Sequence, residues 1–330
     1  MKRFLPDTFI LLMIAMVILA VIFPFPAADD SPINLTRIIA IGISLVFFLH
    51  GANLEREKLV SSVKKWRVHT LIQGMTFVLF PIIGLIIFFA TGELLPDILR
   101  LGFFFLAALP STISSSVALT GVARGNVPVA VFNATLSGLI GMIITPALMG
   151  IVSTTTMGGL SIGDAIVDIA LTLLAPFVLG QLMRPIIAPI LAKHKWILSR
   201  FDRGVILMIV YASFASSVLG GVWTQFSIMQ FFVTAIIVMI LLFAAIAVSI
   251  FASRRLNLST EDEVATVFCG STKSLANGAP IAQILFAGSP SLGLILLPLM
   301  LYHQLQLIVC AMLAQRYAEK QSLVANPAAE

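Results

Sequence analysis

The sequence has few charged residues and only two cysteines. Lys, Arg, Asp and Glu make up 11% of its 330 residues, whereas 59% are hydrophobic. Soluble domains carry about 25% charged residues, so this composition excludes an ordinary soluble protein. Cys269 and Cys310 lie in apolar runs without metal-type spacing, which favours buried thiols over a disulfide or a zinc site. The mean hydropathy of +1.06 indicates that most of the chain lies in lipid.

Apolar runs recur along the whole chain and leave no room for a sizeable soluble domain. Roughly 20 apolar residues are needed to cross a bilayer core. The first run also resembles a secretory signal, because FPFPAADD follows a short apolar segment, but an internal repeat requires it as a helix. The runs predict ten spans, at residues 8–23, 33–50, 68–91, 98–123, 127–152, 164–185, 204–221, 228–252, 262–287 and 290–315.

The net charge of +5 has a topological explanation that does not involve nucleic acid. All but three of the 20 Lys and Arg residues fall on one side of the ten-span topology. By the positive-inside rule this side is cytoplasmic, with both termini on it, in the inner (plasma) membrane. Arg37 and Arg100 lie near outer span ends and can snorkel, so topology leaves Lys273 unexplained. The basic residues on the cytoplasmic side are Lys2, Arg3, Arg56, Lys58, Lys64, Lys65, Arg67, Arg124, Arg184, Lys193, Lys195, Arg200, Arg203, Arg254, Arg255, Arg316 and Lys320.

Two hydrophilic interruptions occupy matching places in the two halves of the chain. Five spans per half require an inverted repeat, with residues 1–152 and 164–315 as the repeats, 153–163 as a linker and 316–330 as a cytoplasmic tail. The fourth span contains LPSTISSSVALTG (109–121), and the ninth contains FCGSTKSLANGAP (268–280). Pro and Gly weaken a helix there, and Ser, Thr and Asn can satisfy the freed backbone. These features predict two discontinuous crossing helices, although close packing of small residues would also give such stretches.

The chain resembles the bile acid:sodium symporter superfamily, and within it the SBF-like, YfeH-type bacterial branch. The matching stretches are FFLHGANL (47–54), LPSTISSSVALTGVARGN (109–126), PFVLGQLMRP (176–185), FCGSTKSLANG (268–278) and LPLMLYHQLQL (297–307). The resemblance implies an all-α multi-pass membrane protein of ten transmembrane helices in two inverted five-helix repeats. It also implies that a core domain moves against a panel domain, with helices 4 and 9 unwound where they cross.

The sodium sites of the family do not carry over whole. In sodium-coupled members the ninth helix carries a glutamate, and this position is Thr272 here. The hydroxyls expected from the fifth helix fall at Ala130 and Ala134, and the third-helix glutamine becomes Thr76, with Gln73 one turn away. The fourth-helix loop is one residue longer than expected, so the match among its three consecutive serines stays open. A vestigial sodium site would lie near Ser115, Ser116 and Thr272.

Lys273 has three functional interpretations and one structural one. It replaces a sodium ion, carries a proton because removal from water favours the neutral amine, or pairs with an anionic substrate. Alternatively it snorkels from a shorter ninth helix that begins near residue 275. Further candidates are Asn133 with Ser137, and His303 with Gln304 and Gln306, although such residues in a bundle more often form interhelical hydrogen bonds. The expected substrate or ion site comprises Gln73, Thr112, Ser114, Ser115, Ser116, Asn133, Ser271, Thr272, Lys273, Ser274, Asn277 and His303.

These features predict a secondary transporter, not an enzyme, that moves a small organic anion by alternating access. The serines lack a nearby base, and no phosphate-binding GxxxxGK[ST] motif is present. The alternative is a regulatory or degenerate transporter-fold protein that affects ion homeostasis without transport. The expected partners are the lipid bilayer and the solute, with Na⁺, H⁺ or no coupling ion, no cofactor, and a monomer as the plausible state.

Overall fold

The computed structural model describes residues 8–28, 31–54, 64–156 and 162–325, and all regular structure in these ranges is helical. Each of the ten predicted spans falls on helix, while Lys2, Arg3, Arg56 and Lys58 lie outside the described residues. The elements are α1 (Thr8–Ile22), η1 (Phe25–Ala27), α2 (Leu35–Asn53), α4 (Trp66–Gly74), η2 (Met75–Leu79), α5 (Phe80–Ala90), α6 (Asp97–Ala108), α7 (Ser114–Val122), α8 (Val127–Thr156), α9 (Ile162–Ile169), η3 (Ala170–Leu174), α10 (Ala175–Leu182), α11 (Arg184–Lys193), α12 (Lys195–Leu219), η4 (Val222–Gln225), α13 (Ile228–Arg255), α14 (Thr260–Ser271), α15 (Leu275–Leu285) and α16 (Leu292–Ala325).

The described helices have the length and surface of a multi-pass membrane protein. Six are long and apolar enough to cross a bilayer, and a seventh is obtained if the bent α9–α11 segment is counted as one span. Large apolar side chains point outward from them, including Ile86 (60% exposed) and Phe89 (74%). Such a surface suits lipid rather than water. By length and composition the qualifying helices are Leu35–Asn53, Trp66–Ala90, Val127–Val152, Arg200–Leu219, Ile228–Arg255 and Leu292–Ser322.

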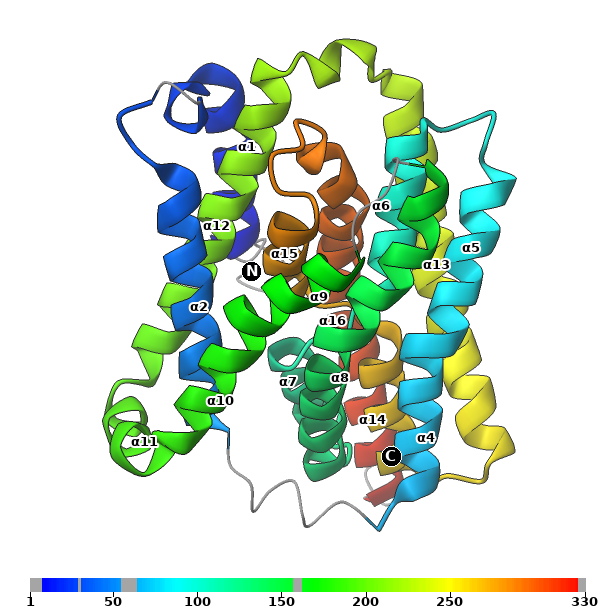
Figure 1. Ribbon diagram of the computed structural model, residues 1–330. Coiled ribbons are helices and arrows are strands. Elements are labelled where there is room, and N and C mark those ends of the chain that lie inside the picture. Colours follow the sequence, from blue (N-terminus) through cyan, green and yellow to red (C-terminus); the bar gives the residue numbers. More distant parts are fainter. Residues whose placement is uncertain (1–7, 29–30, 55–63, 157–161, 326–330) are drawn as a thin grey trace.

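The helices form two bundles (Figure 1). The small bundle contains α1, α2, α10 and α12, and the large bundle contains α4 to α8 and α13 to α16. Each bundle therefore takes helices from both halves of the chain. Within the small bundle α2 and α10 cross at backbone distance, because a Cβ at Gly51 would clash with Phe177 O and one at Gly180 with Phe48 O. Only glycine allows these two helices to approach so closely.

The bundles meet where α12 packs on α15 and α16. Gly293 N donates to Ser217 Oγ at 3.2 Å, and a Cβ on Gly293 would lie 2.7 Å from that oxygen. One turn further on, a Cβ on Gly220 would lie 2.6 Å from the Pro290 Cβ. We call this region the α12–α16 contact. Among the described residues it has no charged pair, and small residues hold the two bundles together at this point.

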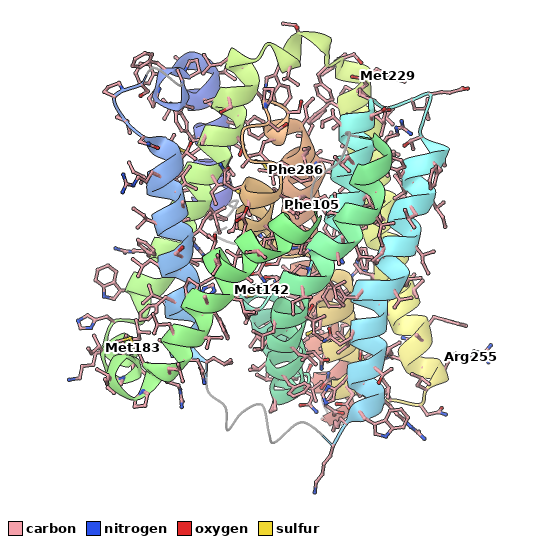
Figure 2. The ribbon with its side chains drawn as sticks, viewed as in Figure 1. Phe105, Met142, Met183, Met229, Arg255 and Phe286 are labelled. Atoms are coloured by element: carbon pink, nitrogen blue, oxygen red, sulfur yellow. The ribbon has the colours of Figure 1, made fainter. Side chains whose placement is uncertain are left out.

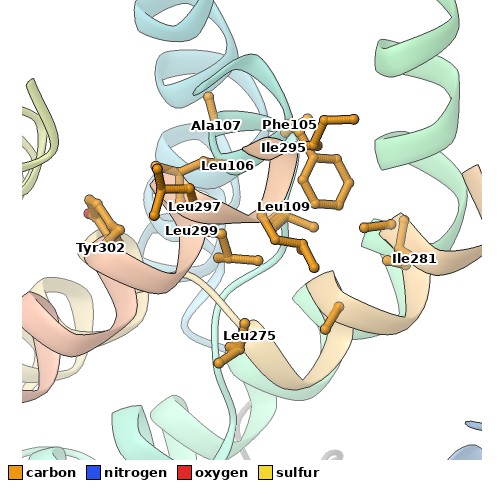
Figure 3. Packing of buried hydrophobic residues seen from close by; sticks show 14 of the residues in the cluster. Phe105, Leu106, Ala107, Leu109, Leu275, Ile281, Ile295, Leu297, Leu299 and Tyr302 are labelled. Carbon is orange, nitrogen blue, oxygen red and sulfur yellow. The ribbon is translucent and has the colours of Figure 1, made fainter. Parts of the chain in front are cut away.

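Both predicted interruptions are present. The fourth span is divided into α6 and α7 by residues 109–113, which are not helical, and the ninth into α14 and α15 by residues 272–274. The two interruptions touch, because Ser274 N donates to Pro110 O at 2.9 Å. Figure 3 shows the end of α6, with Ala107 and Leu109, beside Leu275 at the start of α15 and Tyr302 of α16. The α16 helix continues to Ala325, beyond the span end expected at residue 315.

Candidate functional site

The end of α6 presents backbone carbonyls that have lost their helical donors. Pro110 has no N–H, and Ser111 N donates instead to Ser137 Oγ at 3.0 Å. Carbonyls at a helix end carry partial negative charge and need partners when they are buried. Three of the carbonyls find a partner in the other interruption: Ala107 O and Leu109 O accept from Lys273 Nζ (2.8 and 2.7 Å), and Pro110 O accepts from Ser274 N. The carbonyl between them, Ala108 O, accepts from Thr145 Oγ1 of α8 at 2.8 Å.

The third carbonyl that Lys273 contacts comes from the π-helical turn η2. In this turn Phe80 N donates to Met75 O, five residues earlier. The next donor in the same register would be Pro81, which has no N–H. Thr76 O is therefore left without an intrahelical partner in that register. It accepts from Lys273 Nζ at 3.1 Å.

Lys273 places its ammonium among these three carbonyls. The side chain is fully buried (0% exposed), and its Nζ also lies 4.0 Å from the centre of the Phe80 ring. Three acceptors match the three N–H donors of an ammonium group, and an aromatic face attracts a cation. Within the described residues, no carboxylate contacts this ammonium group. We call Thr76 O, Ala107 O, Leu109 O and the Phe80 ring the lysine cage.

This geometry corrects the snorkelling interpretation. The helix α15 does begin at Leu275, as that interpretation required. The Lys273 side chain, however, turns into the protein and reaches η2 and α6 instead of a membrane surface. The reason is that two interrupted helices supply free carbonyls within its reach, which a surface would not.

The unwound backbone at residue 273 is held by a glutamine of α16. Lys273 N donates to Gln306 Oε1 at 2.8 Å, and Gln306 Nε2 donates to Lys273 O at 2.9 Å. This side chain therefore replaces both partners that an intact helix would supply. His303 joins the same group, with its Nδ1 2.9 Å from Gln306 Nε2. Tyr302 Oη donates to Ser271 O at 2.6 Å and closes the end of α14.

Hydroxyl groups fill the other side of the crossing. Thr272 Oγ1 lies 2.7 Å from Ser116 Oγ and 3.2 Å from Ser111 Oγ, and both Thr272 and Ser116 donate to Phe268 O. Of the three consecutive serines, the structure thus brings Ser116 to Thr272. Ser115 instead donates to Thr112 Oγ1 at 3.3 Å. The expected vestigial sodium position therefore holds a compact cluster of neutral hydroxyls.

Gln73 and Asn133 lie in a separate polar group between α4 and α8. Gln73 Nε2 donates to Asn133 O at 3.1 Å, and Asn133 Nδ2 lies 2.8 Å from His69 Nδ1. Both side chains are thus engaged in interhelical hydrogen bonds. The structure does not bring them to the lysine cage.

The remaining predicted residues lie at the ends of α14, α15 and α7. Ser274 caps α15 by accepting from Asn277 N at 3.1 Å, and Ser271 donates to Val267 O within its own helix. The start of α7 differs, because Ile113 provides no side-chain cap and Ser114 is exposed. The first turn of α7 is therefore the accessible part of the crossing.

Sequence reasoning placed Ser137 and Gln306 only among the secondary candidates, and it left Ser111 and Phe80 out of the expected site. Ser111 is a polar residue within an apolar span, and that is the signal by which it could have been included. Phe80 gives no such signal among 24 phenylalanines. Among the described residues, no group of three or more His, Cys, Asp or Glu side chains is arranged to hold a metal ion.

Basic and acidic residues from four segments meet at one end of the large bundle. Asp262, in the first turn of α14, accepts from Lys65 Nζ at 2.7 Å and from Asn126 Nδ2 at 2.8 Å. Its neighbour Glu263 accepts from Arg254 Nε at 3.2 Å. These contacts tie the start of α4, the α7–α8 turn and the end of α13 to the start of α14. Several of the predicted cytoplasmic segments therefore lie together.

Known proteins resemble the chain over nearly its whole length. Residues 7–319 match the SBF-like CPA transporter family. The protein PA2026 of Pseudomonas aeruginosa is 42% identical over 99% of this chain and 98% of its own length. The putative symporter YfeH of Escherichia coli is 40% identical over 94% and 92%, and sodium/bile acid cotransporter 7-B of Xenopus laevis is 28% identical over 95% and 92%. The chain belongs to the SBF-like CPA transporter family of membrane transporters.

Proposed function

We propose that this protein is a secondary active transporter of a small organic anion, in which the Lys273 ammonium takes the place of a coupling sodium ion. The lysine cage is the observation that carries the proposal. Two backbone carbonyls at the end of the broken helix α6 and a third from the π-helical turn η2 form the kind of oxygen cavity that coordinates a cation. A covalently attached cation fills it here, so the crossing is neutralised without an ion from solution.

The same contacts argue against the other two roles of Lys273. A neutral amine has only two N–H donors, and its lone pair would face a carbonyl oxygen or the Phe80 ring. The cage therefore suits the protonated lysine, not a proton carrier. An anionic substrate would need access to the ammonium group, and the Lys273 side chain is fully buried. The lysine thus acts as a fixed charge.

The arrangement of the bundles supports an inverted repeat and alternating access. The small bundle holds the first two predicted spans of each half, and the large bundle holds the last three of each half. An inverted repeat distributes its helices in this manner. The small bundle touches the large one through the α12–α16 contact, where no ion pair is found among the described residues, and through α9 and η3, which precede α10 and pack on α8 and α15. Rocking of one bundle against the other is therefore the motion that we propose.

The opening turn of α7 is the proposed binding place for the solute. Its backbone N–H groups lack a side-chain cap, and a helix start attracts anions. Thr112 and Ser114 add hydroxyl donors there, Ser115 orients the Thr112 hydroxyl by donating to its oxygen, and Asn277 of α15 is slightly exposed (8%). A carboxylate on a small organic molecule fits this set of neutral donors.

The distribution of basic residues and their ion pairs support a topology with both termini in the cytoplasm. Figure 2 shows Met183, beside the basic segment 184–203, and Arg255 at the same end of the molecule, with Met229 at the other end. Lys65 and Arg254 reach that end too, through Asp262 and Glu263. The basic residues thus gather on one side, as a cytoplasmic face requires.

Uptake into vesicles tests the proposal. Purified protein in proteoliposomes is offered a panel of labelled small carboxylates in sodium buffer and in N-methylglucamine buffer. We expect uptake in both buffers by the natural protein and by Thr234→Val, a control whose hydroxyl bonds only its own helix. The variant Lys273→Met should lose uptake in both buffers. Strict dependence on sodium together with full activity of Lys273→Met would refute the charge replacement, and absence of uptake for every carboxylate would refute the anion transport.

A further inference from the structure

The helix α11 turns sharply away from the helix that precedes it. It follows α10 after a single residue, Met183, and lies at 90° to the Val167–Leu182 segment. Pro185 opens it, a position where proline suits a helix start. Because α10 belongs to the apolar small bundle, a helix perpendicular to it runs along the membrane surface. Figure 1 shows α11 at the lower corner of the small bundle, beyond the ends of α2 and α10.

The two sides of α11 differ in their surroundings. Leu191 is buried against the bundle, whereas Ile186 (68% exposed) and Ile190 (58%) have no protein cover. Leu182, just before the bend, is also 68% exposed. A helix that lies in the membrane interface places such side chains among the acyl chains. The isoleucines therefore indicate that α11 dips into one leaflet.

Positive charge surrounds these apolar side chains. Between residues 184 and 203 the sequence has five Lys and Arg residues and one acidic residue, Asp202. Lys193 and Arg200 are exposed, whereas Lys65 and Arg254 on the neighbouring basic segments form ion pairs with Asp262 and Glu263. Lys193 and Arg200 form no ion pair among the described residues, so their charges suit an anion outside the chain.

An exposed tryptophan marks the depth of this segment. Trp196 is 57% exposed, and the Arg200 guanidinium lies 5.1 Å from the centre of its ring. Tryptophan favours the level of the lipid headgroups. An arginine stacked on it is held at the level where phosphate groups lie.

We propose that α11 and the start of α12 form a binding surface for anionic phospholipids. The phosphodiester group is held by Lys193 and Arg200, the ring of Trp196 lies beside the headgroup, and the acyl chains cover Ile186 and Ile190. Charge complementarity and the uncovered apolar side chains select a lipid over a soluble anion, because a soluble anion would leave the isoleucines in water. Since α11 joins α10 to α12, a lipid bound here holds the small bundle at the membrane surface.

Lipid binding to the purified full-length protein tests this surface. Native mass spectrometry measures retention of phosphatidylglycerol against phosphatidylcholine with the same acyl chains. We expect the natural protein to prefer phosphatidylglycerol and the preference to weaken with salt. The double variant Lys193→Gln/Arg200→Gln should lose about tenfold or more of this preference, since each basic residue near a membrane surface adds considerably to anionic lipid binding.

A matched pair of substitutions distinguishes a site from general charge. The control Arg255→Gln/Lys320→Gln also removes two positive charges, but from exposed positions outside the proposed surface. Arg255, like Arg200, stacks on an aromatic ring, that of Phe251. Arg255 lies at the same end of the molecule as α11 (Figure 2). This control should keep the preference. An equal loss in both variants, or no loss in Lys193→Gln/Arg200→Gln, would overturn the proposal, and both variants are checked by their elution volume and thermal unfolding.

Discussion

The two interrupted helices look alike in sequence but contribute opposite chemistry. The α6–α7 interruption supplies acceptors, because Pro110 removes a donor and leaves carbonyls at Ala107 and Leu109. The α14–α15 interruption supplies donors, through the Lys273 ammonium and Ser274 N. Neither could be buried in lipid alone, since unpaired polar groups there cost several kcal/mol each. The difference teaches that the crossing is a complementary pair and that each half needs the other.

Removing the ammonium should break this complementarity most strongly. Lys273→Met keeps the apolar stem but leaves three buried carbonyls without donors, and we expect a loss of about 3 kcal/mol of stability. Thermal unfolding of the purified protein in detergent measures it. Thr234→Val, also fully buried, should change little because its hydroxyl bonds only its own helix. Equal unfolding temperatures for Lys273→Met and the natural protein would contradict the account of the cage.

Removing the glutamine clamp should have the next largest effect. Gln306→Leu leaves Lys273 N unpaired in a buried place and leaves Lys273 O with only the 3.5 Å contact to His303 Nδ1, with an expected cost of about 2 kcal/mol. Gln304→Leu is the matched control in the same helix, because Gln304 makes only a 3.8 Å contact with Met13 Sδ. Hydrogen exchange of the α14–α15 segment reports the loss directly. If both leucine variants exchanged equally, the clamp would have no special role.

A serine of α8 supports the α6–α7 interruption, and its replacement should have a smaller effect. Ser137→Ala removes the partner of Ser111 N and leaves a buried N–H unpaired, which we expect to cost about 1.5 kcal/mol. Thermal unfolding should place this variant between Gln306→Leu and the natural protein. Full stability of Ser137→Ala would show that water or another group satisfies Ser111 N.

The smallest effect is expected at the cap of α15. Ser274→Ala removes one capping bond, to Asn277 N, at a cost of about 1 kcal/mol, and Ser274→Gly should cost only a few tenths. The ratio of the two thermal shifts is the measurement. A larger effect for Ser274→Gly than for Ser274→Ala would show that backbone flexibility, not the cap, controls the start of α15.

The sequence predicted the positions of the interruptions better than their partners. Pro110 and the glycines around Lys273 marked both breaks, and the isolated lysine marked the site. A carbonyl cage was one of the expectations for Lys273, but its members could not be predicted, because a backbone oxygen of Thr76, Ala107 or Leu109 gives no signal in the residue type. Thr76 became an acceptor only through the π-helical turn, which has no sequence signature of its own beyond Pro81. The register of the longer α6–α7 loop likewise decided that Ser116, and not Ser115, meets Thr272.

The lysine cage also constrains the order in which the protein can be assembled. Its acceptors lie at residues 76, 107 and 109, and its donor at residue 273. During synthesis from the N-terminus, the first half is therefore made long before the ammonium that its carbonyls need. Until then those carbonyls need another donor, because unpaired polar groups in lipid are costly. Arrival of Lys273 with the ninth span is the step that supplies their final partner.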